Sequence, residues 1–245
     1  MKTINQQLED LYRKFLIEPL DSPPFNDDNL SAPFLIKFTD DSTIADAGLR
    51  VMFFGQEPRD WIGKEHTMDE VREKYRNDFD DFSDKPREGP FWRILEEMKN
   101  TINERLSDKR VSYVWNNIVK ADYEGEKNWK VPDDIYNNFC DINRGLILGE
   151  IEIIKPDVLV FFTGPNIYYD KKIDYVFNNG KKIDKKGTEK GVNINTLAEM
   201  RLSEYGNSYI TYHPLYLGRN AKSKKGIVLS AIAEQCAAVA MSKVK

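Results

Sequence analysis

The chain has 245 residues, and its 36 lysines and arginines against 40 aspartates and glutamates give a formal charge of −4 at pH 7. Hydrophobic residues make up 40% of the sequence and aromatic residues 12%, which excludes a disordered chain. The length permits one large domain or two small ones. No repeat or low-complexity tract is visible, and we expect a single domain over residues 1–245.

The composition also argues against membrane, secreted and metal-binding proteins. The most apolar stretches are too short or too interrupted to cross about 30 Å of hydrocarbon. The N-terminal segment has acids and glutamines where a signal peptide has an apolar stretch. Cys140 and Cys236 fit no zinc-binding spacing, and two histidines are too few for a histidine-based centre. We therefore expect a cytoplasmic protein with no metal, no cofactor and no membrane partner.

The first half of the sequence alternates helical and strand patterns. Apolar residues at helical spacing predict a helix over residues 3–17, and four prolines make residues 18–34 irregular. The apolar run at residues 49–55 predicts a buried strand that ends in a turn. Residues 57–88 hold 11 acidic and 7 basic residues, which predicts a solvated excursion with a short helix near residues 68–75.

The second half continues this alternation. The patterns predict helices over residues 90–106, 133–154, 166–178 and 222–244, and strands at residues 111–117, 157–164 and 208–212. Residues 180–195 are rich in lysine, glycine and asparagine, which favours an exposed loop or hairpin. Alternation of this kind predicts an α/β fold, a three-layer α/β/α sandwich whose short, mainly parallel sheet has four strands.

Polar residues follow three of the predicted strands at their carboxyl ends, where ligand sites lie in such sheets. Gln56 and Glu57 follow the first strand, Asn116 and Asn117 end the second, and His213 follows the fourth. A carboxylate, an amide and an imidazole therefore reach one edge of the sheet. This combination suits water activation, hydrogen-bond recognition of a flat polar ligand and stabilisation of a developing anion.

Three short motifs at these positions resemble those of the uracil-DNA glycosylase superfamily. They are GQEPR at residues 55–59, NIVK at residues 117–120 and HPLYLG at residues 213–218, in the order found in that family. The resemblance implies a uracil-DNA glycosylase-like fold. It also implies a monofunctional hydrolase that cleaves the N-glycosidic bond of uracil or a related modified base in DNA, without a metal.

The same resemblance implies a role for each matching residue. Glu57 positions the attacking water, His213 supports the departing base, and Asn117 reads the base edge, with Asn116 as the alternative if the register differs by one. An asparagine suits this task because its amide both donates and accepts hydrogen bonds. The remaining assignments are Gln56 and Pro58 in the base pocket, Phe91 or Trp92 as the aromatic that stacks on the extruded base, and Leu217 as the wedge in the base stack.

The sequence departs from the family pattern at several positions. Glu57 stands where the family has Asp, which moves the carboxylate by about 1 Å and can cost on the order of a hundredfold in rate. Arg59 replaces the tyrosine that excludes the methyl group of thymine. Leu215 and Tyr216 replace the Ser-Pro pair that grips phosphate. The fold inference is therefore stronger than the inference of activity.

A basic segment follows the last motif. No Asp or Glu occurs between Tyr205 and Ala233, and this stretch contains four cations. They are Arg219, Lys222, Lys224 and Lys225. Positive charge beside the proposed wedge suits contacts with the phosphates of single- or double-stranded DNA, although the chain as a whole is acidic.

Each assignment has a structural alternative. Glu57 fits a first-turn acid that favours a helix dipole, Asn117 fits a turn, and Leu217 fits a core residue at a helix start. Two functional alternatives also remain: a catalytically weak nucleic-acid-binding module of the same fold, and a hydrolase of a small nucleoside ligand.

Overall fold

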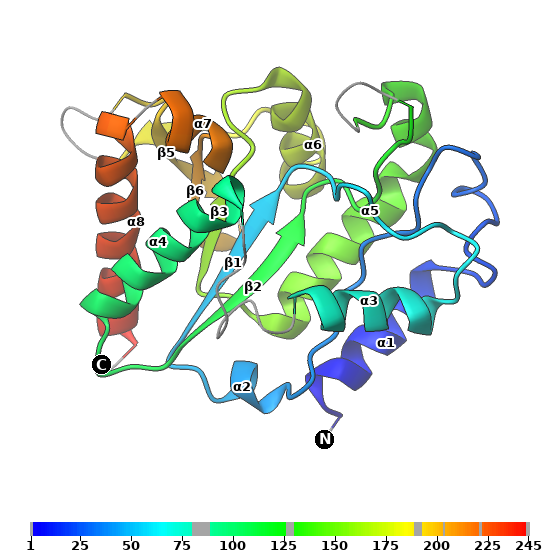
Figure 1. Ribbon diagram of the computed structural model, residues 1–245, viewed down its shortest axis with the longest axis horizontal. Coiled ribbons are helices and arrows are strands. Elements are labelled where there is room, and N and C mark those ends of the chain that lie inside the picture. Colours follow the sequence, from blue (N-terminus) through cyan, green and yellow to red (C-terminus); the bar gives the residue numbers. More distant parts are fainter. Residues whose placement is uncertain are drawn as a thin grey trace.

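The computed structural model describes residues 2–79, 89–125, 130–188, 193–202, 204–220 and 222–243, without the side chains of residues 220, 222 and 223. Within them, six strands form one sheet in the order β2-β1-β3-β6-β5-β4 (Figure 1). The strands are β1 (Leu49–Gly55), β2 (Val111–Asn117), β3 (Val158–Phe161), β4 (Lys185–Gly187), β5 (Leu197–Leu202) and β6 (Tyr205–Thr211). Strands β2, β1, β3 and β6 are parallel, and β5 and β4 extend the sheet in antiparallel fashion.

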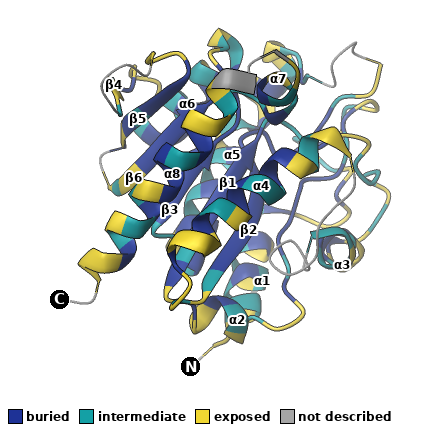
Figure 2. Cartoon of the chain, turned by 60° about the vertical axis from the view of Figure 1, so that its left-hand side comes forward, coloured by how far each residue is buried: buried dark blue, intermediate teal, exposed yellow. Residues whose placement is uncertain are grey.

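Helices cover both faces of this sheet. They are α1 (Ile4–Phe15), α2 (Ser42–Ala45), α3 (Met68–Phe79), α4 (Pro90–Arg105), α5 (Asp133–Ile154), α6 (Ile167–Asn178), α7 (Pro214–Asn220) and α8 (Lys222–Ser242). Helices α4 and α8 lie in front of the sheet in Figure 2, and α1, α5 and α6 lie behind it. The predicted α/β class is confirmed, but the prediction of four strands is wrong because the described residues form six.

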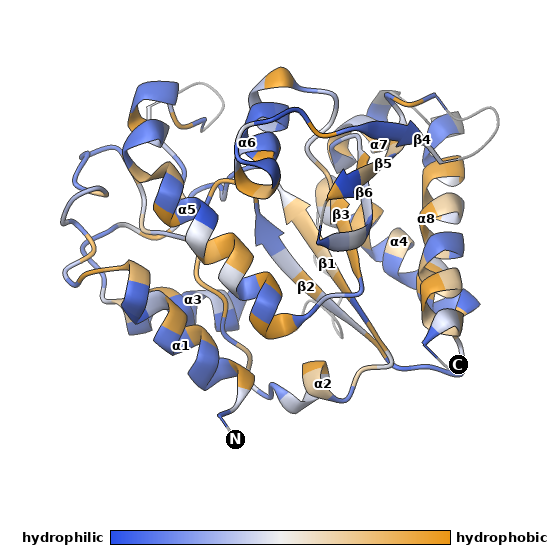
Figure 3. Ribbon diagram, turned by 180° about the vertical axis from the view of Figure 1, so that it is seen from behind, coloured by the Kyte–Doolittle hydropathy of each residue, from blue (hydrophilic) through white to orange (hydrophobic). Residues whose placement is uncertain are grey.

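The core lies between the sheet and its helices. After Arg50, strand β1 reads as a continuous apolar run because both of its faces are covered, and Val51, Met52, Phe53 and Phe54 are all fully buried. The central strands β1 and β3 are hydrophobic and the outer strand β4 is hydrophilic, while helices such as α1 and α5 carry residues of both kinds (Figure 3). The parallel register aligns Gly55 with Asn117, so the carboxyl ends of β1 and β2 lie at the same level.

Several segments differ from the sequence predictions. Strand β4 lies within residues 180–195, the predicted loop or hairpin, and pairs antiparallel with β5, a strand that the patterns did not predict. Helix α7 occupies a segment to which the patterns assigned no element. Helix α3 is longer than expected and is not simply solvated, because Val71 and Tyr75 are buried. Residues 80–88 of the acidic segment lie outside the described part of the chain.

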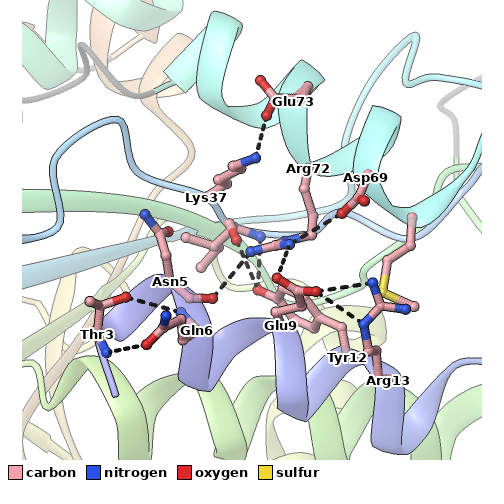
Figure 4. Close-up of polar contacts among 12 residues, drawn as sticks. Thr3, Asn5, Gln6, Glu9, Tyr12, Arg13, Lys37, Asp69, Arg72 and Glu73 are labelled. Atoms are coloured by element: carbon pink, nitrogen blue, oxygen red, sulfur yellow. Dashed lines mark hydrogen bonds and ion pairs between the residues drawn. The ribbon is translucent and has the colours of Figure 1, made fainter. Parts of the chain in front are cut away.

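Helix α3 is anchored to α1 by buried charge (Figure 4). The guanidinium of Arg72, almost fully buried, donates to a Glu9 carboxylate oxygen at 3.2 Å and to the Asn5 carbonyl at 3.2 Å. Helix α1 is fixed at its start by a capping box, in which Thr3 and Gln6 each bond the other's backbone N–H. This contact fixes the position of α3, whose last residue, Phe79, lines a cavity at the carboxyl ends of the strands.

The C-terminal helix bears on the expectation of no membrane-spanning segment. By length and composition, Lys224–Ser242 is apolar enough to cross a membrane, the single segment of this kind among the residues described. Core helices that never meet a membrane have the same length and composition, so the expectation stays a prediction. In this structure the segment belongs to α8, which packs against α4 and β6.

Candidate functional site

A cavity of about 660 Å³ opens at the carboxyl ends of β1 and β2. Its apolar walls are aromatic, and polar side chains converge on it from the strand ends. The aromatic residues are Phe34, Trp61, Phe79, Phe91, Trp92 and Trp115, and the polar residues are Gln56, Glu57, Arg59, Asp60, Asp78, Asn117, Lys130, Asn166, Tyr169 and His213. A concave apolar space with a few convergent polar groups is the usual form of a site for a flat organic ligand.

Glu57 is the carboxylate of this cavity. It accepts hydrogen bonds from the hydroxyl of Tyr169, which lies 2.6 Å from one oxygen and 2.9 Å from the other. Burial raises the pKa of Glu57 to about 7, while the Tyr169 hydroxyl and the charge of Lys130 act in the opposite direction. A carboxyl group that titrates near neutral pH is suited to orienting water or accepting its proton.

Asn117 contributes the amide of the cavity. It ends β2, its side chain is almost fully buried, and its carboxamide oxygen lies against Gly55 on the neighbouring strand. A Cβ on Gly55 would come within 2.5 Å of both the Asn117 oxygen and the Trp115 ring. Gly55 is therefore required here by close approach, and it leaves Asn117 the space to lie in the cavity wall.

His213 supplies the imidazole. Its Nδ1 accepts a hydrogen bond from the backbone N–H of Leu215 at 3.3 Å, and its ring lies 5.0 Å from that of Phe91 between centroids. Burial lowers the pKa of His213 to about 4, so the ring is neutral near pH 7. Because Nδ1 is an acceptor, the single proton of the neutral ring sits on Nε2, where it can be donated to a ligand.

Asn116 is not available to the cavity. Consecutive side chains of a strand point to opposite faces, and Asn116 faces away from Asn117. Its amide donates to Glu150 at 2.9 Å and accepts from Lys120 at 2.7 Å, and all three side chains are fully buried. The alternative assignment of base reading to Asn116 is therefore wrong.

Of the other residues predicted to lie at the site, all but Leu217 line the cavity. Gln56 and Pro58 line the cavity, and Gln56 donates to the Thr163 carbonyl at 3.2 Å, which holds its side chain toward β3. Phe91 and Trp92 both line it as well. Leu217 does not: its side chain is 0% exposed in the core, so it cannot be the predicted wedge in this arrangement. Leu215, two residues earlier, lines the cavity instead.

The basic residues after the last motif have different surroundings. Arg219 and Lys224 are exposed. Lys225 forms an ion pair with Glu97 at 2.6 Å, so part of its charge is already neutralised within the protein. Lys222 begins α8, and its side chain lies outside the described part of the structure.

Sequence patterns missed several cavity residues. Tyr169 and Lys130 come from segments far from the three motifs, and Trp61 and Phe34 lie in stretches without a regular period. The sequence could have indicated Tyr169, because it lies in the first turn of the helix that follows the carboxyl end of β3. The other three residues reach the cavity through tertiary packing, which local sequence does not encode.

No protein-family model matches this chain, and no curated protein matches it either. Among the described residues, no group of three or more His, Cys, Asp or Glu side chains is placed to hold a metal ion. The expectations of no metal and no cofactor stay predictions.

Proposed function

We propose that this protein is a uracil-DNA glycosylase-like hydrolase that removes uracil or a related modified base from DNA. The observation that carries the proposal is the meeting of Glu57, Asn117 and His213 in one aromatic-walled cavity. These residues belong to the three motifs that resemble the superfamily. The same convergence supports the finer fold assignment and DNA as partner.

The cavity residues suit each part of the reaction. The aromatic walls can stack on an extruded base, and the Asn117 amide can pair with an adjacent carbonyl and N–H. As the N-glycosidic bond breaks, its electrons pass to the base, and the Nε2–H of neutral His213 stabilises the negative charge on a base oxygen. Ionised Glu57 orients a water, whose oxygen bonds to the sugar carbon and whose proton leaves through the carboxylate. That proton passes, directly or through solvent, to the base anion, so the products are the neutral free base and an abasic sugar with a new hydroxyl group.

Abasic-site formation on oligonucleotides tests this proposal. The substrates carry uracil or another damaged base, in single and double strands, and the proteins are wild type, Glu57→Gln and Asn117→Ala. We expect both variants to lose at least about 100-fold in rate, Glu57→Gln because it removes a positioned acid–base group and Asn117→Ala because it leaves the base without a positioned hydrogen-bond partner. Glu104→Gln is the matched control, because Glu104 is exposed on α4 outside the cavity lining, and it should react like wild type.

Wild-type protein that is folded yet releases no base from any strand would contradict the proposal. Salt-dependent strand binding without release would then support a binding module. Hydrolysis of free deoxyuridine as fast as of uracil in a strand would support a nucleoside hydrolase. That second candidate is favoured by one observation, the burial of Leu217, which leaves α7 without the predicted wedge.

A further inference from the structure

Two tyrosines lie on either side of His213 in the sequence and stack on each other. Tyr212 follows β6 and Tyr216 lies on α7, with ring centroids 4.5 Å apart and planes inclined by 34°. Tyr216 is 39% exposed, which is unusual for a large aromatic side chain in this protein. His213 and Leu215, which lie between the two tyrosines in the sequence, line the cavity, so the pair adjoins it.

The surroundings of this tyrosine pair are cationic. The Lys224 ammonium lies 5.8 Å from the centroid of the Tyr212 ring, and Arg219 is exposed on the same short helix as Tyr216. No Asp or Glu lies between Tyr205 and Ala233. A half-buried tyrosine that supports an exposed one, with cations beside them, has the chemistry of a surface that stacks on a nucleobase and contacts its phosphate.

The tyrosine pair also favours a single strand over a duplex as the ligand. The face of a base is open to stacking in a single strand, whereas in a duplex it is covered by the bases above and below. Leu217, which was expected to fill the hole left by a base extruded from a duplex, is buried in the core. The segment therefore presents a stacking surface and lacks the predicted wedge.

We propose that Tyr212 and Tyr216 form a stacking platform for an unpaired base next to the base held in the cavity, so that the substrate is single-stranded nucleic acid. Leu215 connects the two sites, since it lies one residue before Tyr216 and lines the cavity. The inference rests on the proposed function for its choice of ligand. It adds the strand preference and two residues that none of the three motifs assigns.

Binding of a labelled oligothymidine strand without uracil tests the platform apart from any chemistry. The affinities of wild type, Tyr216→Ala and Tyr216→Phe are measured by fluorescence anisotropy. We expect Tyr216→Ala to weaken binding by about 5- to 100-fold, since stacking on one aromatic ring contributes ~1–3 kcal/mol per base. Tyr216→Phe keeps the ring and should bind within about twofold of wild type, because stacking tolerates loss of the hydroxyl.

Two comparisons complete the experiment. Tyr175→Ala removes a partly exposed tyrosine from α6, where its hydroxyl contacts Asp141, and should bind like wild type. Lys224→Ala should lower the slope of log affinity against log salt by about 0.7, the value for one phosphate contact on a single strand. The platform is overturned if Tyr216→Ala binds like wild type, if wild type does not bind the strand, or if it prefers the matching duplex.

Failure of the platform is distinguishable from failure of the proposed function. Strand binding through Tyr216 without release of any base would keep the platform and remove the glycosylase. Release of uracil with Tyr216→Ala binding and reacting like wild type would keep the glycosylase and remove the platform.

Discussion

Two glutamates, the buried Glu150 and the half-buried Glu57, each accept a hydrogen bond from a tyrosine, yet their surroundings differ. Glu150 is 0% exposed, and its oxygens lie 2.6 and 2.7 Å from the Lys120 ammonium, which is also 0% exposed. It accepts from Tyr12 at 2.9 Å as well. Glu57 has Tyr169 as the one side-chain donor that bonds it among the described residues, and it lines the cavity.

The difference separates a fully paired carboxylate from one that faces a cavity. A buried charge that is paired and fully hydrogen-bonded fixes the packing around it, and its groups are unavailable for chemistry. Burial raises the pKa of Glu57, and its few partners offset that effect only in part. The set of partners therefore distinguishes the proposed catalytic glutamate from the structural one.

The largest expected effect comes from breaking the structural pair. Lys120→Met leaves Glu150 buried with only Tyr12 and Asn116 as donors, so we expect the free energy of unfolding to fall by about 3–5 kcal/mol. Urea denaturation measures it. The double variant Lys120→Met/Glu150→Leu removes both charges and should recover most of the loss. A single variant within about 1 kcal/mol of wild type would contradict the comparison, because a lone buried charge should cost more.

The next effect is on the pH dependence of stability. Glu57 has a pKa raised from 4.5 to about 7, so between these values the folded protein holds a proton that the unfolded chain has lost, and stability falls as pH rises. His213 has a pKa lowered from 6.5 to about 4, so the unfolded chain holds the extra proton and stability rises with pH. The two contributions oppose each other between pH 4.5 and 6.5.

Single variants should reveal the pH dependence of stability that each group contributes. We expect the stability of Glu57→Gln to rise with pH over this window, and that of His213→Asn to fall, each differing from wild type by up to about 1.4 kcal/mol per pH unit. Thermal or urea denaturation at several pH values measures both. Wild-type slopes in both variants would show that neither group has a shifted pKa.

The smallest expected effect is on the pH dependence of the rate, when the tyrosine that donates to each glutamate is replaced by phenylalanine. Tyr169→Phe removes the donor that favours ionised Glu57, so its pKa should rise. The ascending limb of kcat/KM against pH should then move upward by about one pH unit. Tyr168→Phe is the control, because the Tyr168 hydroxyl donates to the Val131 carbonyl instead.

Tyr12→Phe should give the opposite result. It leaves the Ile36 N–H and Glu150 each short of a partner, so stability should fall by about 1–3 kcal/mol with no movement of the limb. Equal effects of Tyr169→Phe and Tyr12→Phe on the limb would remove the distinction between the two carboxylates.

Elements that one local pattern defines were predictable from the sequence. The bounds of β1 and β2 follow from two short, mainly apolar stretches, and those of α5 follow from a long amphipathic stretch closed by Pro156. Strand β5 was missed although its residues alternate, with Ala198 and Met200 buried and Arg201 exposed. Its charged residues concealed a strand that is half exposed.

The site was predictable only where it follows strand ends. Glu57, Asn117 and His213 come directly after buried strands, so topology alone brings them to one edge. The position of Tyr169 against Glu57 depends on where α6 packs, and local sequence does not encode that distance. The wedge assignment of Leu217 was wrong because an apolar residue at a helix start packs inward when a core lies beneath it.

Two adjacent residues of β2, Asn116 and Asn117, serve two different parts of the molecule. One belongs to the charged network in the core and the other to the cavity, and only the alternation of β2 keeps them apart. An insertion or deletion of one residue within Val111–Asn117 would exchange their faces, so that core and site would fail together. The length of β2 is therefore constrained by the same two side chains that constrain its composition, because Asn116 must face the core network and Asn117 the cavity.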